Sequence, residues 1–263
     1  MRFLSKIFDK RANWAIPYAI FLVVFVALPL LLIAVYAFQN EQGEFSLVNF
    51  TRFIEQSEAL QTFVYSIGVA LVTTILCILL GYPAAWILAN RKLNRSEVMV
   101  VLFILPMWIN ILVRTLATVA LFGFMNLPLG EGALIFGMVY NFLPFMIYPI
   151  YNTLKKMDHS LIEAAEDLGA PPMKVFWKVT VPLSMPGVVS GVMMVFMPTI
   201  STFAIAELLT YNNVKLFGTT IQENINNGVW TYGAALSLIM LVIIGITSLF
   251  SGGEEQSDSD SLI

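Results

Sequence analysis

Long hydrophobic runs separated by short polar segments make up most of the chain. The first run follows the basic segment MRFLSKIFDKRANW and is too long for the apolar part of a signal peptide, so we read it as an uncleaved span. Each of the six runs exceeds the roughly 20 residues that a helix needs to cross the hydrocarbon of a bilayer. The predicted spans are residues 15–38, 63–89, 98–124, 132–154, 183–211 and 229–250.

The composition agrees with this pattern. Of the 263 residues, 58% are hydrophobic and only 12% are charged, whereas a soluble domain carries about 25% charged residues. This excludes a water-soluble enzyme, a nucleic-acid binder and a disordered chain. The single Cys77 and the single His159 exclude an internal disulfide and a cysteine- or multi-histidine-based metal site. We therefore expect an all-α polytopic membrane bundle of about six transmembrane helices, with no metal.

The distribution of lysine and arginine predicts the orientation. If the N-terminus is cytoplasmic, eleven basic residues face the cytoplasm, against only Arg52 and Lys215 outside. Both termini are then cytoplasmic, with residues 1–14 as a cytoplasmic segment, 15–250 as the membrane domain and 251–263 as an acidic, disordered tail. The eleven are Arg2, Lys6, Lys10, Arg11, Arg91, Lys92, Arg95, Lys155, Lys156, Lys174 and Lys178.

The inner loop 155–182 is long, polar and patterned. Ser160 and Glu163 fit a capping box at the start of a helix. Gly169 is a natural C-terminal stop, and Pro171 with Pro172 can open a second short helix. The residues alone thus predict a helix–glycine–helix device on the cytoplasmic face.

The same loop resembles a known motif. Glu163, Ala164 and Ala165, then three residues, Gly169, nine residues and Val179-Thr180-Val181-Pro182 resemble the EAA loop of ABC-importer permeases. Val179 and Val181 replace the usual isoleucine and leucine, but the spacing from the alanines through Gly169 to Pro182 has no gap. An amphipathic helix on the lipid surface, or a purely local role of Glu163 in capping, is the alternative explanation.

The resemblance implies a type I ABC-importer permease fold and a mechanism. In that family the loop docks on a separate ATPase, so Glu163, Ala164, Ala165, Gly169 and Pro182 would couple this chain to an ABC ATPase dimer. ATP and Mg would bind to that partner, and this chain would be a non-catalytic subunit without a cofactor of its own. The chain has no G-x-x-x-x-G-K-[ST] segment, as this interpretation requires.

A wider resemblance suggests the substrate. Residues 79–90, 104–117, 141–170 and 224–237 are similar to the B-type permeases of spermidine/putrescine importers. This implies polyamine transport in a bacterial cytoplasmic membrane, with a second, different permease and an extracellular or periplasmic polyamine-binding protein as partners. An ABC permease for another small solute, and a self-contained secondary transporter or channel, remain the alternatives.

Two formal charges lie inside the predicted spans, and both count as functional candidates. Glu207 could face the pathway and attract a cationic substrate. Alternatively, Glu207 and Arg114 form a structural ion pair, or their side chains reach the membrane surface.

Aromatic side chains could stack on the ammonium groups of such a substrate. Packing within the bundle or an interfacial aromatic belt would account for the same residues. The candidates are Trp108, Phe203, Tyr211, Trp230 and Tyr232. Separately, Gly187 and Gly191 form a GxxxG pair that permits close helix approach.

Overall fold

The computed structural model describes residues 16–90 and 98–252, and these residues are largely helical. Outside the helices, they contain one isolated β-bridge, between Gln39 and Phe45. Residues 1–15, the basic loop 91–97 and the tail 253–263 lie outside the described part, together with the predictions made for them. The described residues form two compact units, 16–57 with 221–242, and 58–90 and 98–220 with 243–252.

The first unit begins with one long helix. Its 22 residues, 16–37, match the first predicted span, and only Ala37 is buried. The following loop is tied to the end of this helix by Asn49, whose Nδ2 donates to the carbonyls of Ala37 (3.1 Å) and Gln39 (2.8 Å). The elements are α2 (Ile16–Leu22), η2 (Val23–Ala27), α3 (Leu28–Ala37), α4 (Val48–Glu55), the later part of α13 (Phe217–Asn226) and the first part of α14 (Trp230–Gly252).

The second unit is built around α8. Leu134, Met138, Met146 and Ile150 on this helix are fully buried and form the centre of the core. The elements of the unit are α5 (Ser57–Ala89), α6 (Val98–Ile104), η3 (Leu105–Trp108), α7 (Ile111–Phe124), α8 (Glu131–Lys156), α9 (Ser160–Asp167), α10 (Pro172–Val175), η4 (Phe176–Thr180), α11 (Val181–Ser201) and α12 (Ala204–Thr210).

Close packing of α11 on α8 depends on small residues. A Cβ added at Gly187 would lie 2.5 Å from Thr153 Oγ1 and 2.9 Å from the carbonyl oxygen of Pro149. One added at Gly191 would lie 2.7 Å from Met146 Sδ. The prediction that this GxxxG pair permits close helix approach is therefore confirmed.

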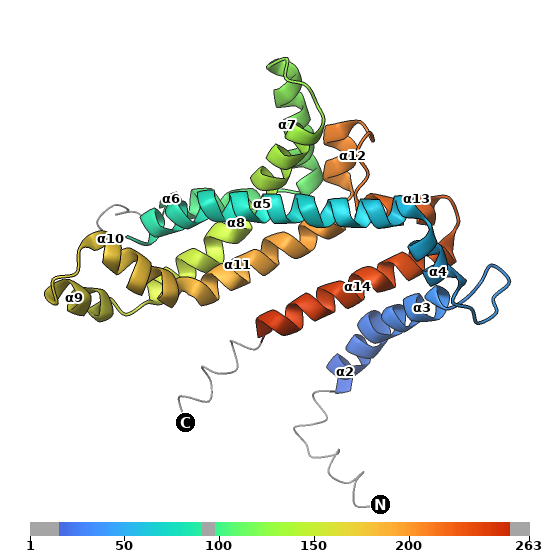
Figure 1. Cartoon of the computed structure of the whole chain (residues 1–263), viewed down its shortest axis with the longest axis horizontal. Coiled ribbons are helices and arrows are strands. Elements are labelled where there is room, and N and C mark those ends of the chain that lie inside the picture. Colours follow the sequence, from blue (N-terminus) through green and yellow to red (C-terminus); the bar gives the residue numbers. More distant parts are fainter. Residues whose placement is uncertain (1–15, 91–97, 253–263) are drawn as a thin grey trace, which may run out of the picture. The chain divides into compact units, whose positions relative to one another are not determined.

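Two of the predicted continuous spans are broken. The third span bends by 98° between Trp108 and Ile111, so that α6 and α7 run in different directions. The fifth ends at Ser201, and α12 starts anew at Ala204. Figure 1 shows α7 and α12 projecting together from the layer that contains α5, α8 and α11. The break in span three follows Pro106 and uses Asn110 as the N-cap of α7, whose Oδ1 accepts from the N–H of Leu112 (2.8 Å).

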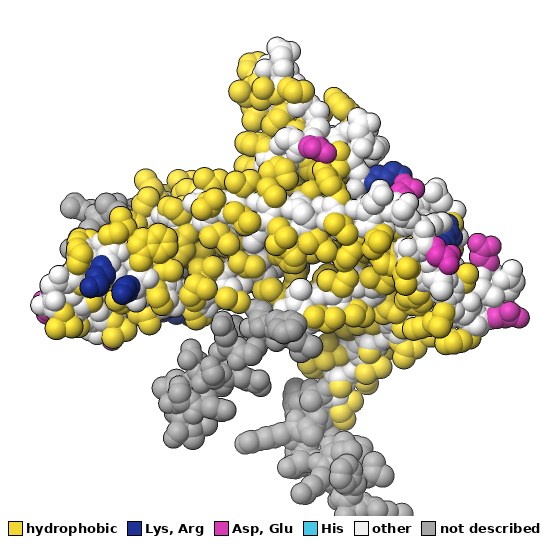
Figure 2. Space-filling model, in the orientation of Figure 1, with side chains coloured by type: hydrophobic (Ala, Val, Ile, Leu, Met, Phe, Trp, Pro, Cys, Tyr) yellow, Lys and Arg dark blue, Asp and Glu magenta, His cyan; other side chains and the backbone are white. Residues whose placement is uncertain are grey.

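Five helices in the described ranges are long and apolar enough to cross a membrane, and the bent pair raises this to six. This agrees with the predicted all-α bundle of about six spans. In Figure 2 hydrophobic side chains cover most of the visible surface over α5, α6 and α11, and Lys and Arg side chains are visible at the end that carries α9 and α10 as well as elsewhere on this face. Such a surface suits a lipid environment and contacts with other membrane chains.

Candidate functional site

The loop 155–182, called the coupling loop below after its expected role, begins with a short helix, α9. Asp158 Oδ1 accepts the N–H of Ser160 at 2.9 Å and so satisfies a free donor at the helix start. The predicted capping box is wrong, because His159 occupies the N-cap position and no side chain there caps the helix. Hydrogen bonds from the backbone N–H and the hydroxyl of Ser160 lower the pKa of the Asp158 carboxyl.

The helix ends just before Gly169, as predicted. This residue has φ +80°, which glycine adopts without steric cost. The N–H of Gly169 bonds to the carbonyl of Glu166 (2.8 Å) and the N–H of Ala170 to that of Ala165 (3.1 Å). This pair of bonds is a Schellman motif, which turns the chain sharply after α9.

The surface of α9 is open. None of its residues is buried, and Glu163 and Ala164 are exposed. Leu168, which follows the helix, is 89% exposed. Lys155, Lys156, Lys174 and Lys178 flank the helix in the sequence. The loop therefore presents an alanine-rich, partly apolar helix with basic residues near it, a surface suited to a complementary groove.

The rest of the motif leads directly into the membrane. The second helix predicted for this loop begins at Pro172, as expected. It is not a separate short segment. It continues through η4 into α11, giving one helix over Pro172–Ser201. Pro182 is exposed near the start of this long helix. The loop is thus joined to α11 by one continuous helix.

A second candidate surface lies on α12. Glu207 lies on this helix, and Phe203 and Tyr211 flank it at the N-cap and C-cap positions. The helix packs into the unit through Ile205 and Leu209, whose side chain contacts Gly137 of α8. Phe203 and Tyr211 are exposed and Glu207 is half-buried. The structure thus places the three predicted residues on one short segment, with Glu207 inside the helix and an aromatic residue at each of its ends.

Arg114 bonds to the backbone of α8 rather than to Glu207. Its side chain is only 5% exposed, and Nη1 donates to the carbonyl of Asn141 on α8 at 3.2 Å. Within the described residues no ion pair joins Arg114 to Glu207. Sequence reasoning missed Asn141, whose Nδ2 also donates to the carbonyl of Gly137 (2.8 Å). Asn141 could have been noticed in the sequence, because it is a polar residue inside the apolar run 132–154.

The other predicted aromatic residues belong to other elements of the chain. Trp108 is 87% exposed at the bend of the third span. Trp230 is also exposed, at the start of α14 in the first unit. Tyr232, in the same unit, is buried, and its ring lies 4.3 Å from the guanidinium carbon of Arg52. That cation–π contact occupies Tyr232 within its own unit.

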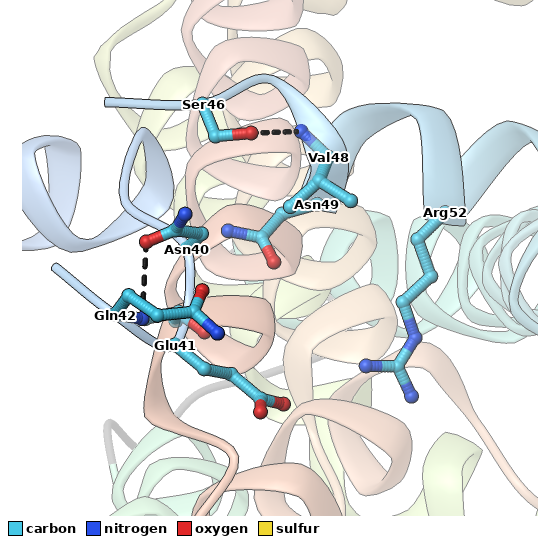
Figure 3. A pocket seen from close by; sticks show the side chains of 8 residues that line it. Asn40, Glu41, Gln42, Ser46, Val48, Asn49 and Arg52 are labelled. Atoms are coloured by element: carbon cyan, nitrogen blue, oxygen red, sulfur yellow. Dashed lines mark hydrogen bonds between the residues drawn. The ribbon is translucent and has the colours of Figure 1, made fainter. Parts of the chain in front are cut away.

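The first unit contains a polar pocket that sequence reasoning did not single out (Figure 3). Its volume is about 320 Å³, and it lies beside the loop between α3 and α4. Asn40 rigidifies this loop, because its Oδ1 accepts the N–H groups of Gln42 (3.0 Å) and Glu44 (2.8 Å). Carboxylate, guanidinium, hydroxyl and amide groups line this pocket, so it could bind a group that both donates and accepts hydrogen bonds. The pocket is lined by Asn40, Glu41, Gln42, Ser46, Val48, Asn49, Arg52 and Thr231.

Solved structures share this fold. A bacterial ABC transporter involved in the import of the acidic polysaccharide alginate contains a chain that superposes with a TM-score of 0.71, covering 98% of this chain and 99% of that one. The MetNI methionine ABC transporter gives a TM-score of 0.60 over 75% and 94%. Sequence identity is 16% in both cases, so these likenesses establish the fold alone.

Sequence comparisons establish the family. The spermidine/putrescine transport system permease protein PotB of Escherichia coli (strain K12) is 32% identical over 252 residues, which cover 87% of this chain and 91% of that protein. Its counterpart in Haemophilus influenzae is 32% identical over 86% and 87%. The family described as binding-protein-dependent transport system inner membrane component matches residues 78–252. This chain is therefore a multi-pass inner-membrane protein and belongs to that family, the permease subunits of ABC importers.

Proposed function

We propose that this chain is a transmembrane permease subunit of an ATP-driven importer for polyamines of the spermidine and putrescine class. The names of relatives that match nearly the whole chain at 32% identity support the substrate class. The segment around α12 supports it as well, since a partly exposed carboxylate flanked in the chain by two exposed aromatic residues suits a protonated amine. In this proposal Glu207, Phe203 and Tyr211 line part of the pathway, and Trp108 and Trp230 are further pathway candidates.

The observation that carries the importer mechanism is the open surface of α9. An eight-residue helix with no buried residue, closed by a left-handed glycine, suits docking into another protein. We assign this docking to an ABC ATPase dimer, which would bind ATP and Mg in place of this chain. Glu163, Ala164, Ala165 and Gly169 would form the contact, and Pro182 would shape its connection to α11.

The remaining partners and the orientation follow the same proposal. A second, different permease would complete the pathway, and an extracellular or periplasmic polyamine-binding protein would deliver the substrate. The lysines around α9 favour a cytoplasmic position for the loop, and hence for both termini. A tag at residue 263 should react only from the inside, and a tag next to Glu44 only from the outside. The reverse pattern would overturn the orientation.

Reconstitution tests the function directly. The chain would be coexpressed with the neighbouring permease and ATPase genes, purified, and placed in vesicles with the binding protein. We expect the ATPase to copurify and labelled spermidine or putrescine to enter the vesicles only with ATP. Uptake without an ATPase would favour a secondary transporter. ATP-dependent uptake of another solute, with no competition from polyamines, would overturn the substrate class.

A further inference from the structure

The point where the coupling loop joins α11 has an unusual backbone. The turn η4, Phe176–Thr180, is π-helical, and the N–H of Val181 bonds to the carbonyl of Phe176 five residues earlier. Pro182 follows immediately. The other π-helical turn in the described residues has the same relation to a proline, because Leu28 bonds to Val23 just before Pro29.

Proline explains both turns. It lacks an N–H, and its ring collides with the carbonyl four residues earlier, so the preceding turn widens. In the first unit this wide turn has no buried residue. At the coupling loop, by contrast, neighbouring aromatic side chains surround the turn. The local geometry is the same, but the second turn is in contact with aromatic side chains of α5.

Tyr82 of α5 contacts both sides of this turn. Its ring meets Phe176 edge-on, with centroids 5.8 Å apart, at the first residue of the turn. Its hydroxyl bonds to Ser184 Oγ at 2.8 Å, beyond the end of the turn. Ser184 donates its own proton to the carbonyl of Val181 (2.9 Å), so Tyr82 is the donor to Ser184. One side chain thus bridges the wide turn from outside.

A second aromatic residue of α5 strengthens the contact. Trp86, one helical turn after Tyr82, also meets Phe176 edge-on, with centroids 6.0 Å apart. Such edge-to-face pairs are favourable because the positive ring edge faces the negative ring surface. Phe176 is therefore packed on two rings of α5, while Trp177 beside it is exposed.

We propose that Tyr82 is a positioning residue that transmits movement of the coupling loop to α5 as well as to α11. The inference rests on the proposed docking of an ATPase on α9. The π-helical turn gives the helix a place to bend, and Tyr82 fixes the two sides of that place to α5. Closure of the ATPase dimer then moves two spans together. Without Tyr82, α11 follows the loop, whereas α5 keeps only the contact of Trp86 with Phe176 and follows the loop less.

The direct test follows both helices separately. In the assembled complex, with Cys77→Ala, a single reporter cysteine is introduced at Leu79 on α5 or at Met185 on α11, which are 63% and 43% exposed in this chain. Thiol-labelling rates are compared with and without trapping of the ATPase by vanadate and ATP. We expect trapping to change the rate at both positions. With Tyr82→Ala the change at Met185 should persist and the change at Leu79 should fall by at least half.

Milder variants isolate the hydrogen bond. Tyr82→Phe and Ser184→Ala each remove it and leave the packing largely intact. Each should lower substrate imported per ATP hydrolysed by about threefold to tenfold, the range expected for loss of one hydrogen bond, and the double variant should be no worse than either. Ser190→Ala is the matched control, because Ser190 Oγ bonds only within its own helix, to the carbonyl of Pro186. Ser190→Ala should leave the amount of substrate imported per ATP hydrolysed unchanged.

The outcomes separate this inference from the proposed function. If trapping changes neither reporter in the chain with Tyr82 intact, the coupling to an ATPase is wrong and the inference falls with it. If both reporters respond equally with and without Tyr82, and Tyr82→Phe keeps the normal transport ratio, the coupling stands and the role of Tyr82 is wrong.

Discussion

Two short helices at different places in the second unit, α9 and α12, are built alike. Each carries one acidic residue in its first turn, Glu163 in α9 and Glu207 in α12. Each is followed by a residue with a left-handed backbone, Gly169 at φ +80° and Tyr211 at φ +51°. Yet α9 buries none of its residues, whereas α12 buries Ile205, Ala206, Leu209 and Thr210.

The two helices differ in how far contacts with their own chain fix their positions. The position of α12 is fixed by its own chain, so its outward face is available for a small ligand. None of the residues of α9 is buried, and the proposed docking of the ATPase would supply the packing that this helix does not find in its own chain. The predictions below change one of these two helices at a time, with the largest expected effect first.

Removing the charge from α12 should have the largest effect. If Glu207 holds a substrate ammonium, Glu207→Gln should reduce polyamine uptake by about tenfold to a hundredfold, the range for a hydrogen bond to a charged group. Abundance of the complex should remain normal, because Glu207 makes no ion pair within the described residues. Uptake by vesicles and immunoblotting of membranes measure the two quantities.

A double-mutant cycle with Arg114 provides the control. Because Arg114 bonds to the carbonyl of Asn141, we expect the coupling energy between Arg114→Leu and Glu207→Gln to be near zero. Strong coupling in abundance would mean that the two charges pair in the assembled complex. Glu207 would then be structural and would no longer be a pathway residue.

Changing the end of α9 should have the next largest effect. Gly169→Leu places a Cβ in the left-handed region, which costs about 1–2 kcal/mol, and should lower ATPase binding by about fivefold to thirtyfold. No atom lies within 4 Å of the added Cβ, so the effect is conformational rather than steric. Copurification of the ATPase measures it.

Gly169→Asn is the matched variant. Asparagine tolerates the left-handed region better than other residues with a side chain, so it should retain most of the binding. Equal loss with asparagine and leucine would show that the glycine is needed for close contact with the partner and not for the turn.

The corresponding change on α12 should act in the opposite direction. Tyr211→Gly removes a side chain from a left-handed position and should stabilise the folded chain by about 1 kcal/mol or less, since the greater flexibility of glycine in the unfolded chain offsets part of the gain. Thermal unfolding in detergent measures this. A lower melting temperature would show that packing of the Tyr211 ring outweighs the backbone strain.

The smallest effect concerns the start of α9. Asp158→Ala should speed hydrogen exchange of the first amides of α9 and leave α12 unchanged. In the wild-type chain the lowered pKa of Asp158 means that its stabilising contribution is present above the pKa of the unfolded chain and is lost as the pH falls through the folded value. Acidification should therefore loosen α9 in the wild type but not in Asp158→Ala. Equal acid sensitivity of the two would contradict the capping role.

Much of the architecture could be predicted from hydrophobicity, because a span of 20 apolar residues needs no information from distant parts of the chain. The breaks at residues 109–110 and 202–203 could not, since the apolar pattern continues through both. They depend on local backbone chemistry, namely the Asn110 cap and the prolines that precede each break, Pro106 and Pro198. Prolines are common in membrane helices, and most of them here leave the helix intact.

The coupling loop was predictable because its chemistry is local in sequence, from Glu163 through Gly169 to Pro182. The contacts of Arg114 and Tyr82 were not. Arg114 bonds to a backbone carbonyl, which any residue provides, so the sequence carries no sign of the partner. Tyr82 meets Ser184, 102 positions later, and only the fold brings them together.

The exposure of Leu168 has a consequence for protein turnover. A newly synthesised copy that has not yet found its ATPase displays this leucine, together with the open helix α9, on the chain surface. Chaperones and membrane proteases recognise such apolar segments, and the assembled partner would hide them. We therefore expect excess copies of this chain to be degraded quickly when the ATPase is scarce, so that the cell keeps the two subunits in balance by removing the unmatched ones.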